Sequence, residues 1–244
     1  MELARKLLAE LFPSRCILCH RTVATNTANP DIEICPACYK ALPDNSPCCS
    51  RCALPLAEEI QGDVLCGRCI KQLPGYDYLY SPFKYEGEVI GLIHQLKFNE
   101  KISCASSIAE LLLNSYQEKI ATQHGKPDCI IPVPLHKKRL RQRGYNQSTE
   151  IARALSKKEG ITIAHDAVER VKVTQEQKGL TAKERRRNIK GVFKVIQTGQ
   201  YRHVLIIDDV VTTGSTVNEL AWVLKKSGVE EVGVLSFVRA PAKT

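Results

Sequence analysis

The chain has 244 residues, a formal net charge of +9, 43% hydrophobic residues and 25% charged residues. This length allows one full domain and a small additional module, and the composition is ordinary for a water-soluble globular protein. No apolar run is long enough to cross a bilayer, so we expect no membrane insertion.

The positive charge is concentrated in one part of the chain. Between Pro132 and Gly191 there are sixteen Lys or Arg residues and six Asp or Glu residues, a surplus of ten. A concentrated basic surface suggests a polyanionic partner such as phosphate groups or nucleic acid. The alternative is a solvated basic face without a partner, and charge alone is weak support for either.

The N-terminal segment, residues 1–16, carries Glu2 and Glu10 among its apolar residues. This pattern predicts a short amphipathic helix that stops at Pro13. A secretory signal peptide would need a longer uncharged core and a cleavage site of small residues. We therefore expect a cytoplasmic protein.

Eight of the eleven cysteines form four identical Cys-x-x-Cys steps. One step brings two thiolates to a metal ion, and two steps complete a tetrahedral site. The intervals of fifteen residues between the first two steps and thirteen between the last two suit zinc ribbons. We predict two structural zinc ions, with these ligands: Cys16, Cys19, Cys35, Cys38, Cys49, Cys52, Cys66 and Cys69.

Other roles for these cysteines are less consistent with the sequence. Disulfides are disfavoured because cytoplasmic thiols are kept reduced, and no βαβ pattern surrounds the steps as a thioredoxin-like redox site would require. Either neighbouring or alternate steps could share a metal, and neighbouring steps are the simpler arrangement. Cys48, Cys104 and Cys129 fall outside the pattern and are expected to be packing residues.

The character of the sequence changes after this ladder, so we expect a zinc-ribbon module over residues 1–72 and a second domain over residues 73–244. Residues 76–85 look like an extended hairpin arm, and residues 89–98 and 102–120 carry apolar side chains at helical spacing.

The rest of the chain alternates strand and helix patterns. We expect helices over 146–157 and 216–226, and strands over 128–134, 161–163, 167–173, 203–207 and 232–238. This alternation indicates an α/β domain with a mostly parallel sheet flanked by helices on both faces.

Residues 204–216, VLIIDDVVTTGST, place two acids and a group of hydroxyls after a buried strand. Ligands of parallel sheets bind beyond the carboxyl ends of the strands, and the N-terminus of the next helix favours phosphate. Asp208 and Asp209 could accept hydrogen bonds from the two hydroxyls of a ribose or bind Mg²⁺. The stretch therefore predicts a sugar 5′-phosphate site, whereas a helix cap and plain turn would need only one acid.

This stretch resembles the motif with which type I phosphoribosyltransferases bind 5-phosphoribosyl 1-pyrophosphate (PRPP). The resemblance implies that Asp208 and Asp209 form the catalytic acid pair and hold the ribose hydroxyls. It also implies a 5′-phosphate site formed by Thr212, Thr213, Gly214, Ser215 and Thr216.

Two further stretches, PVPLHKKRLRQRGYNQS over residues 132–148 and TQEQKGLTAKERRRN over residues 174–188, narrow the family. Together with the cysteine ladder they resemble the ComF family, the ComFC competence proteins and their GntX relatives, over essentially the whole chain. The resemblance implies a double zinc ribbon joined to a phosphoribosyltransferase domain that uses incoming DNA in natural transformation. It further implies single-stranded DNA, a ComFA-like helicase and a DprA-like loading protein as partners.

The basic residues of both stretches suit polyphosphate binding, because arginine neutralises diphosphate oxygens with a bidentate fork. Arg139, Arg143 and Gly144 follow a strand end, where a pyrophosphate loop is expected. Residues 178–187 predict a mobile flap over the ligand, with the equal alternative that residues 183–187 are only a charged helix start. The candidates for contacts with nucleic acid are Lys137, Lys138, Arg141, Tyr145, Arg185, Arg186 and Arg187.

Two functions fit these patterns. The first is a protein of natural transformation or DNA utilisation that binds PRPP, or a 5′-phosphoribosyl group, with Mg²⁺ and handles single-stranded DNA. The alternative is an active phosphoribosyltransferase of nucleotide metabolism, in which an acceptor displaces pyrophosphate from PRPP. No base-binding hood is recognisable, so the acceptor is not identified. A zinc-stabilised scaffold with a vestigial pocket is disfavoured by the intact acid pair and hydroxyl loop.

Overall fold

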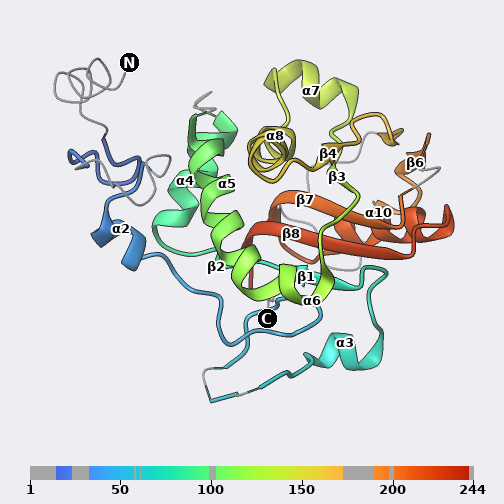
Figure 1. Cartoon of the computed structure of the whole chain (residues 1–244), viewed down its shortest axis with the longest axis horizontal. Coiled ribbons are helices and arrows are strands. Elements are labelled where there is room, and N and C mark those ends of the chain that lie inside the picture. Colours follow the sequence, from blue (N-terminus) through green and yellow to red (C-terminus); the bar gives the residue numbers. More distant parts are fainter. Residues whose placement is uncertain are drawn as a thin grey trace.

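The computed structural model describes residues 15–23, 33–57, 59–60, 62–98, 103–172, 189–197 and 201–241. Within these residues a sheet of six strands forms the centre of the molecule, in the order β1-β8-β7-β3-β4, with β2 also paired to β8 (Figure 1). Every pairing in it is parallel. The strands are β1 (Tyr78–Tyr80), β2 (Phe83–Lys84), β3 (Cys129–Pro132), β4 (Thr162–Ile163), β7 (His203–Val211) and β8 (Glu231–Arg239).

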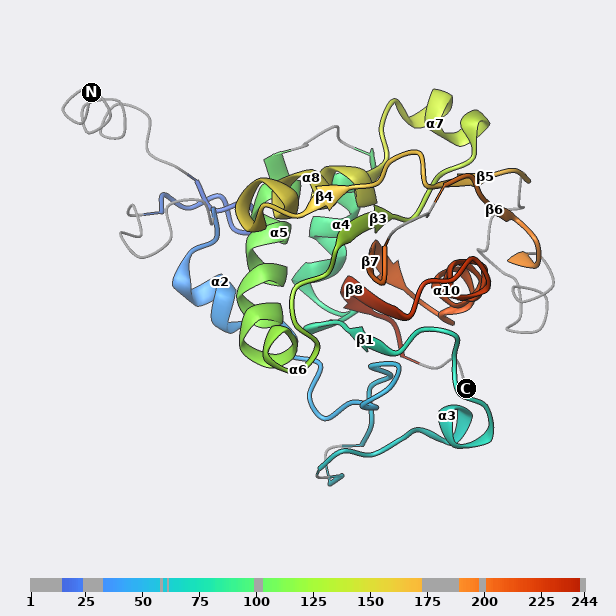
Figure 2. The same cartoon turned by 45° about the vertical axis from the view of Figure 1, so that its right-hand side comes forward.

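Helices cover both faces of this sheet, which confirms the predicted α/β class (Figure 2). Alternate residues of a strand point to opposite faces. Leu205 and Ile207 of β7 accordingly contact the core beneath three helices: α4 (Glu88–Phe98), α5 (Ser103–Tyr116) and α8 (Gln147–Glu159). Val204 and Ile206 contact the core beneath α10 (Ser215–Lys226).

The shorter elements connect these layers. After α5 the chain passes through a π-helical turn, η1 (Gln117–Ala121), and a short α6 (Thr122–His124) before it enters β3. Between β3 and α8 lies α7 (Lys137–Arg143). β5 (Val168–Arg170) and β6 (Phe193–Val195) form a separate antiparallel pair, so the strand expected over residues 167–173 lies outside the central sheet.

The arm expected as a hairpin is not a hairpin. β1 and β2 both run parallel to β8 in one continuous register, with Tyr80 opposite Leu235 and Phe83 opposite Val238. The chain continues in the same direction through Ser81 and Pro82, where proline cannot donate to the ladder but does not reverse the strand. The arm is therefore one interrupted edge strand.

The cysteine-rich segment contacts both sides of the sheet. Cys16 and Ile34 belong to the core on the α4 side, whereas Cys49 and Cys66 belong to the core on the α10 side. Its short helices α2 (Pro36–Lys40) and α3 (Gly67–Lys71) lie well apart in both views. Among the helices in the described part of the chain, none combines the length and the apolar character that crossing a membrane requires. The N-terminal helix that was expected to stop at Pro13 lies outside the described residues.

Candidate functional site

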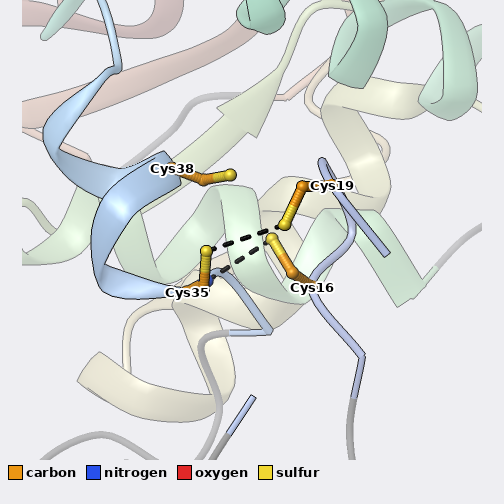
Figure 3. Close-up of side chains that lie close together, drawn as sticks. All are labelled: Cys16, Cys19, Cys35 and Cys38. Carbon is orange, nitrogen blue, oxygen red and sulfur yellow. Dashed lines mark hydrogen bonds between the residues drawn. The ribbon is translucent and has the colours of Figure 1, made fainter. Parts of the chain in front are cut away.

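The first four-cysteine cluster joins the first and second Cys-x-x-Cys steps (Figure 3). Its four sulfur atoms all lie within 4.8 Å of one another, and the sulfurs of Cys19 and Cys35 are 3.7 Å apart. A tetrahedral zinc ion with bonds of about 2.3 Å requires sulfurs about 3.8 Å apart. The backbone N–H of Cys35 also donates to the sulfur of Cys16, over 3.4 Å. The residues fit a structural zinc ion.

The second cluster joins the third and fourth steps in the same way. The sulfurs of Cys52 and Cys66 are 3.7 Å apart, and the N–H of Cys66 donates to the sulfur of Cys49 over 3.3 Å. All four of these cysteines are buried. Neighbouring steps therefore share a cluster in both cases, as the simpler of the two arrangements predicted.

Each cluster contains one thiol whose pKa is lowered, and the thiolate is the form that binds metal. Burial raises the pKa of Cys16, but hydrogen bonds from backbone N–H groups outweigh it and bring the pKa to about 6. A hydrogen bond from Cys52 lowers the pKa of Cys49 to about 4 against the effect of burial. All eleven cysteines lie in the described residues, and all have free thiols.

The phosphate loop, residues 212–214 with the first turn of α10, forms a small pocket of about 40 Å³. Gly214 is the N-cap of α10 and has a φ of 76°, in the left-handed region that favours glycine. As a glycine it contributes no side-chain cap to α10, and the N-terminus of a helix favours an anion. The predicted residues that line this pocket are Asp208, Thr212, Thr213, Gly214, Ser215 and Thr216.

Two hydroxyl groups of the phosphate loop lie within hydrogen-bond distance of each other. The Oγ1 of Thr213 lies 2.8 Å from the Oγ of Ser215 and accepts a hydrogen bond from the N–H of Ser215 over 3.3 Å. The loop therefore has a defined shape before a ligand arrives.

The two acids lie inside β7 rather than after it, because the strand continues to Val211 instead of ending near Ile207. β7 and β8 pair at Asp208 and resume pairing at Val210. Between these points the carboxylate of Asp208 accepts from the N–H of Asp209 over 3.0 Å, and that of Asp209 accepts from the N–H of Val210 over 2.8 Å. Asp208 lines the phosphate pocket and also accepts from the hydroxyl of Ser148 at the start of α8, over 3.3 Å.

A buried arginine that sequence reasoning missed lies near Asp208. Burial lowers the pKa of Arg170, and the charge of Arg139 lowers it further, whereas Asp208 acts in the opposite direction. The guanidinium lies over the ring of Phe193, 5.6 Å from its centroid. Arg170 is therefore within electrostatic range of Arg139, a predicted phosphate ligand, and of Asp208.

The segment expected as a pyrophosphate loop folds into α7. His136 caps its start by accepting from the N–H of Lys138 over 3.1 Å, and Gly144 ends it with a φ of 80°. Arg143 donates to Gln147 over 2.8 Å, and Lys137 forms an ion pair of 2.8 Å with Glu169. Lys and Arg have favourable helix propensities, so the basic run of α7 forms a helix once His136 caps its start and Gly144 ends it.

The residues that were predicted to contact nucleic acid lie in different environments in the structure. Lys137, Lys138 and Arg141 are exposed on α7, whereas the hydroxyl of Tyr145 donates to the carbonyl of Leu96. The expected flap over residues 178–187, with Arg185, Arg186 and Arg187, lies outside the described residues.

A second buried arginine connects the second cluster to the phosphate loop. Arg239 is 1% exposed, and its guanidinium donates to the carbonyls of Cys52 (3.0 Å), Val211 (3.1 Å), Thr212 and Ala240 (2.9 Å). Burial lowers its pKa. One side chain at the end of β8 therefore fixes a metal-ligand residue and the start of the phosphate loop together.

Comparisons with known proteins agree with this arrangement. Residues 7–73 match the family model of the double zinc ribbon domain, and residues 107–244 match that of the phosphoribosyl transferase domain. The chain is 36% identical over 239 residues to Competence protein F of Haemophilus influenzae, across 96% of this chain and 100% of that protein. The chain belongs to the ComF family.

Further relatives carry a second name. The DNA utilization protein YhgH of Shigella flexneri is 36% identical over 228 residues, which cover 93% of this chain and 97% of that protein. YhgH of Escherichia coli K12 is 35% identical over 228 residues, which cover the same 93% of this chain and 97% of that protein. The comparisons confirm the predicted family and its combination of a double zinc ribbon with a phosphoribosyltransferase domain.

Proposed function

We propose that this ComF protein binds PRPP, or a 5′-phosphoribosyl group, with Mg²⁺ and handles incoming single-stranded DNA in the cytoplasm. The observation that carries the proposal is the phosphate pocket, where Asp208 and the hydroxyl-rich start of α10 line one small cavity. The names of its relatives, for competence and for DNA utilization, support the DNA part. We also propose that the zinc-ribbon module comprises residues 1–72 and the phosphoribosyltransferase-like domain residues 73–244.

In this proposal each part of the pocket has a separate role. The phosphate loop holds the 5′-phosphate through N–H groups and hydroxyls at the helix N-terminus. Asp208 and Asp209 accept hydrogen bonds from the ribose hydroxyls. Mg²⁺, an ion that prefers oxygen ligands and phosphate, neutralises the diphosphate with help from Arg139 and Arg143 beside Gly144.

The acid pair provides the direct test of the sugar-phosphate part. We expect Asp208→Asn/Asp209→Asn to weaken PRPP binding at least about 100-fold, because hydrogen bonds to charged groups contribute about 1.5–3 kcal/mol each and both carboxylates lose their charge. Isothermal titration calorimetry with Mg²⁺ measures this. The matched control is Asp166→Asn, which removes an exposed aspartate from a turn. Equal affinity of the double variant and the wild type would refute the assignment.

The DNA part is tested separately. Exposed basic residues on α7, among them Lys137, Lys138 and Arg141, favour contacts with a strand backbone. We expect a labelled oligodeoxythymidylate to bind with an affinity that falls steeply as salt rises, because binding releases condensed counterions. An affinity independent of salt would contradict a basic interface. A ComFA-like helicase and a DprA-like loading protein are the proposed partners for later tests of the whole pathway.

Catalytic turnover is a second candidate, which the match to the phosphoribosyl transferase domain favours. In that reaction an acceptor forms a bond to the anomeric carbon of the ribose while the bond to pyrophosphate breaks. Release of pyrophosphate from PRPP in the presence of an acceptor, lost in the Asp208→Asn/Asp209→Asn variant, would establish it. Binding of PRPP without pyrophosphate release across nucleobases and oligonucleotides would leave the protein as a binder.

A further inference from the structure

A second and larger cavity lies beside the phosphate pocket and shares Thr213, Gly214 and Ser215 with it. Its volume is about 590 Å³, within the range of about 300–1,000 Å³ of small-molecule sites. We call it the ribbon cleft, because most of its other walls come from α3 of the second zinc ribbon, the segment that follows α3, and α10; Ile189, Lys190, Cys52 and Arg239 complete it.

The ribbon cleft contains an exposed aromatic side chain on a rigid support. Trp222 of α10 is 45% exposed and lines the cleft. A Cβ placed on Gly75 would lie 2.9 Å from Cγ, 2.9 Å from Cδ1 and 3.0 Å from Nε1 of the indole. Nearly equal distances to three consecutive ring atoms place Gly75 over the face of the ring rather than at its edge. The backbone of Gly75 therefore supports one face of the indole.

The support itself is held in place by a hydrogen bond. The N–H of Gly75 donates to the Oδ1 of Asn218 over 2.8 Å, and Asn218 lies one turn before Trp222 on α10. Gly75, in the segment that follows α3, is thus tied to α10 beside the ring. An aromatic ring ordered in this way loses little conformational entropy when a ligand stacks on its other face.

The charge around the ribbon cleft is positive. The exposed cations Arg68 and Lys71 of α3 and Lys190 line it. The carboxylate of Glu219 also lines it, but accepts a hydrogen bond from the N–H of Gly191 over 2.7 Å. An exposed ring with several cations around it suits a nucleotide, whose base stacks while its phosphates pair with the cations.

We propose that the ribbon cleft is a base-stacking subsite for single-stranded DNA, in which one base stacks on Trp222 and Arg68, Lys71 and Lys190 bind the flanking phosphates. The inference rests on the DNA part of the proposed function and adds where on the protein the strand binds. It puts the strand on the α10 side of the sheet, against the second zinc ribbon and next to the phosphate loop. The exposed residues of α7 then provide additional contacts, not the stacking site.

Trp222 is the only tryptophan in the chain, so intrinsic fluorescence reports on this one residue. The full-length zinc-loaded protein is titrated with a labelled 20-nucleotide oligodeoxythymidylate, and tryptophan emission is followed beside fluorescence anisotropy of the labelled strand. We expect the emission to be quenched with the same midpoint as the anisotropy change. Double-stranded DNA of the same length is expected to leave the emission nearly unchanged, because its bases are already stacked.

Variants separate stacking from other effects. Trp222→Ala is expected to weaken strand binding about 5- to 100-fold, and Trp222→Tyr is expected to retain most of the affinity, because aromatic rings stack on any base. The control Ile196→Ala removes an exposed apolar side chain outside the cleft and is expected to bind as the wild type does. Unchanged PRPP binding by calorimetry shows that Trp222→Ala remains folded.

The outcomes distinguish the two proposals. If the wild type binds the strand but its emission does not change and Trp222→Ala binds equally well, the subsite is refuted while DNA handling stands. If the wild type shows no strand binding by anisotropy, the DNA part of the proposed function fails and the subsite fails with it. PRPP binding is unaffected by either result.

Discussion

The two four-cysteine clusters have the same ligands and similar spacing but different surroundings. In the first cluster only Cys16 is buried and Cys19 is exposed, whereas all four cysteines of the second cluster are buried. The first contacts the core beneath α4, and the second shares a core with α10 and is joined to the phosphate loop by Arg239. One copy of the repeated four-cysteine motif therefore lies at the periphery, whereas the other adjoins the candidate site.

The largest expected difference comes from removing one ligand from each cluster. Cys52→Ser is expected to abolish cooperative folding, because structural zinc contributes about 10–16 kcal/mol in small modules and a whole domain is stable by only about 5–15 kcal/mol. Cys19→Ser is expected to leave a cooperatively folded α/β domain and to lower the zinc content from about two ions to about one. Circular dichroism on heating, together with metal analysis, measures both. Equal losses in the two variants would contradict the comparison.

A smaller effect is expected when the connection between the second cluster and the phosphate loop is cut. Arg239→Met removes the donor to four carbonyls, of which that of Val211 keeps the N–H of Ala240. Because the loss at each of the other three costs about 1–3 kcal/mol, we expect a total of at least about 3 kcal/mol and weaker PRPP binding. Urea unfolding and calorimetry give the two quantities. The control is Arg153→Ala, which removes an exposed arginine that pairs with Glu150 and should cost less than about 0.5 kcal/mol. Wild-type stability of Arg239→Met would show that the connection is dispensable.

Two glycines sharpen the comparison further. Gly75→Ala places a methyl group 2.9 Å from the indole of Trp222, so we expect a loss of about 1–3 kcal/mol from overpacking on the side of the second cluster. Gly91 in α4, on the side of the first cluster, has open space around it, and Gly91→Ala should stabilise by about 0.5–1 kcal/mol. The two melting temperatures should shift in opposite directions. A stabilised Gly75→Ala variant would mean that the ring is not held against the linker.

The smallest expected effect concerns acid, which both protonates cysteine ligands and acts on the α/β domain. The carboxylate of Asp128 accepts from the N–H groups of His203 and Arg202, over 2.9 and 2.8 Å, and these bonds lower its pKa. Its contribution to stability is therefore present above the unfolded pKa of about 3.9 and is lost as pH falls through the lower folded value.

Asp128→Asn should be less stable than the wild type near neutral pH and should converge with it in acid. Unfolding measured in urea at a series of pH values, with zinc content followed in parallel, separates this carboxylate from metal loss. An unchanged gap between the two proteins at the lowest pH would contradict the assignment.

The sequence was sufficient for features that depend on local spacing. The four cysteine steps, the strand that begins at His203 and the glycine at the start of α10 are each set by a few neighbouring residues, and the structure contains all of them, although the strand extends past Asp208. The direction of the edge strand could not be derived, because pairing of residues 78–84 with β8 involves segments more than 150 positions apart.

The functional residues that the sequence did not reveal were missed for the same reason. Arg239, Arg170 and Trp222 look like ordinary members of a strand or helix, and their roles arise from neighbours that are distant in the sequence: Cys52, Asp208 and Gly75 respectively. Only the presence of a charged residue at the end of an otherwise apolar strand gave a signal for Arg239. A buried guanidinium needs hydrogen-bond acceptors, and in the folded chain backbone carbonyls accept from Arg239.

The guanidinium of Arg239 donates hydrogen bonds to the carbonyls of Cys52 and Thr212 at once. This bridge therefore provides a route by which zinc binding at the second cluster and ligand binding at the phosphate loop can affect each other. Thermodynamic reciprocity then gives the bridge a second direction: whatever factor zinc adds to sugar-phosphate affinity, the sugar phosphate must add to zinc affinity. If the proposed binding of PRPP holds, a cell rich in PRPP would hold the second metal more tightly than a starved one, although no ligand atom had changed.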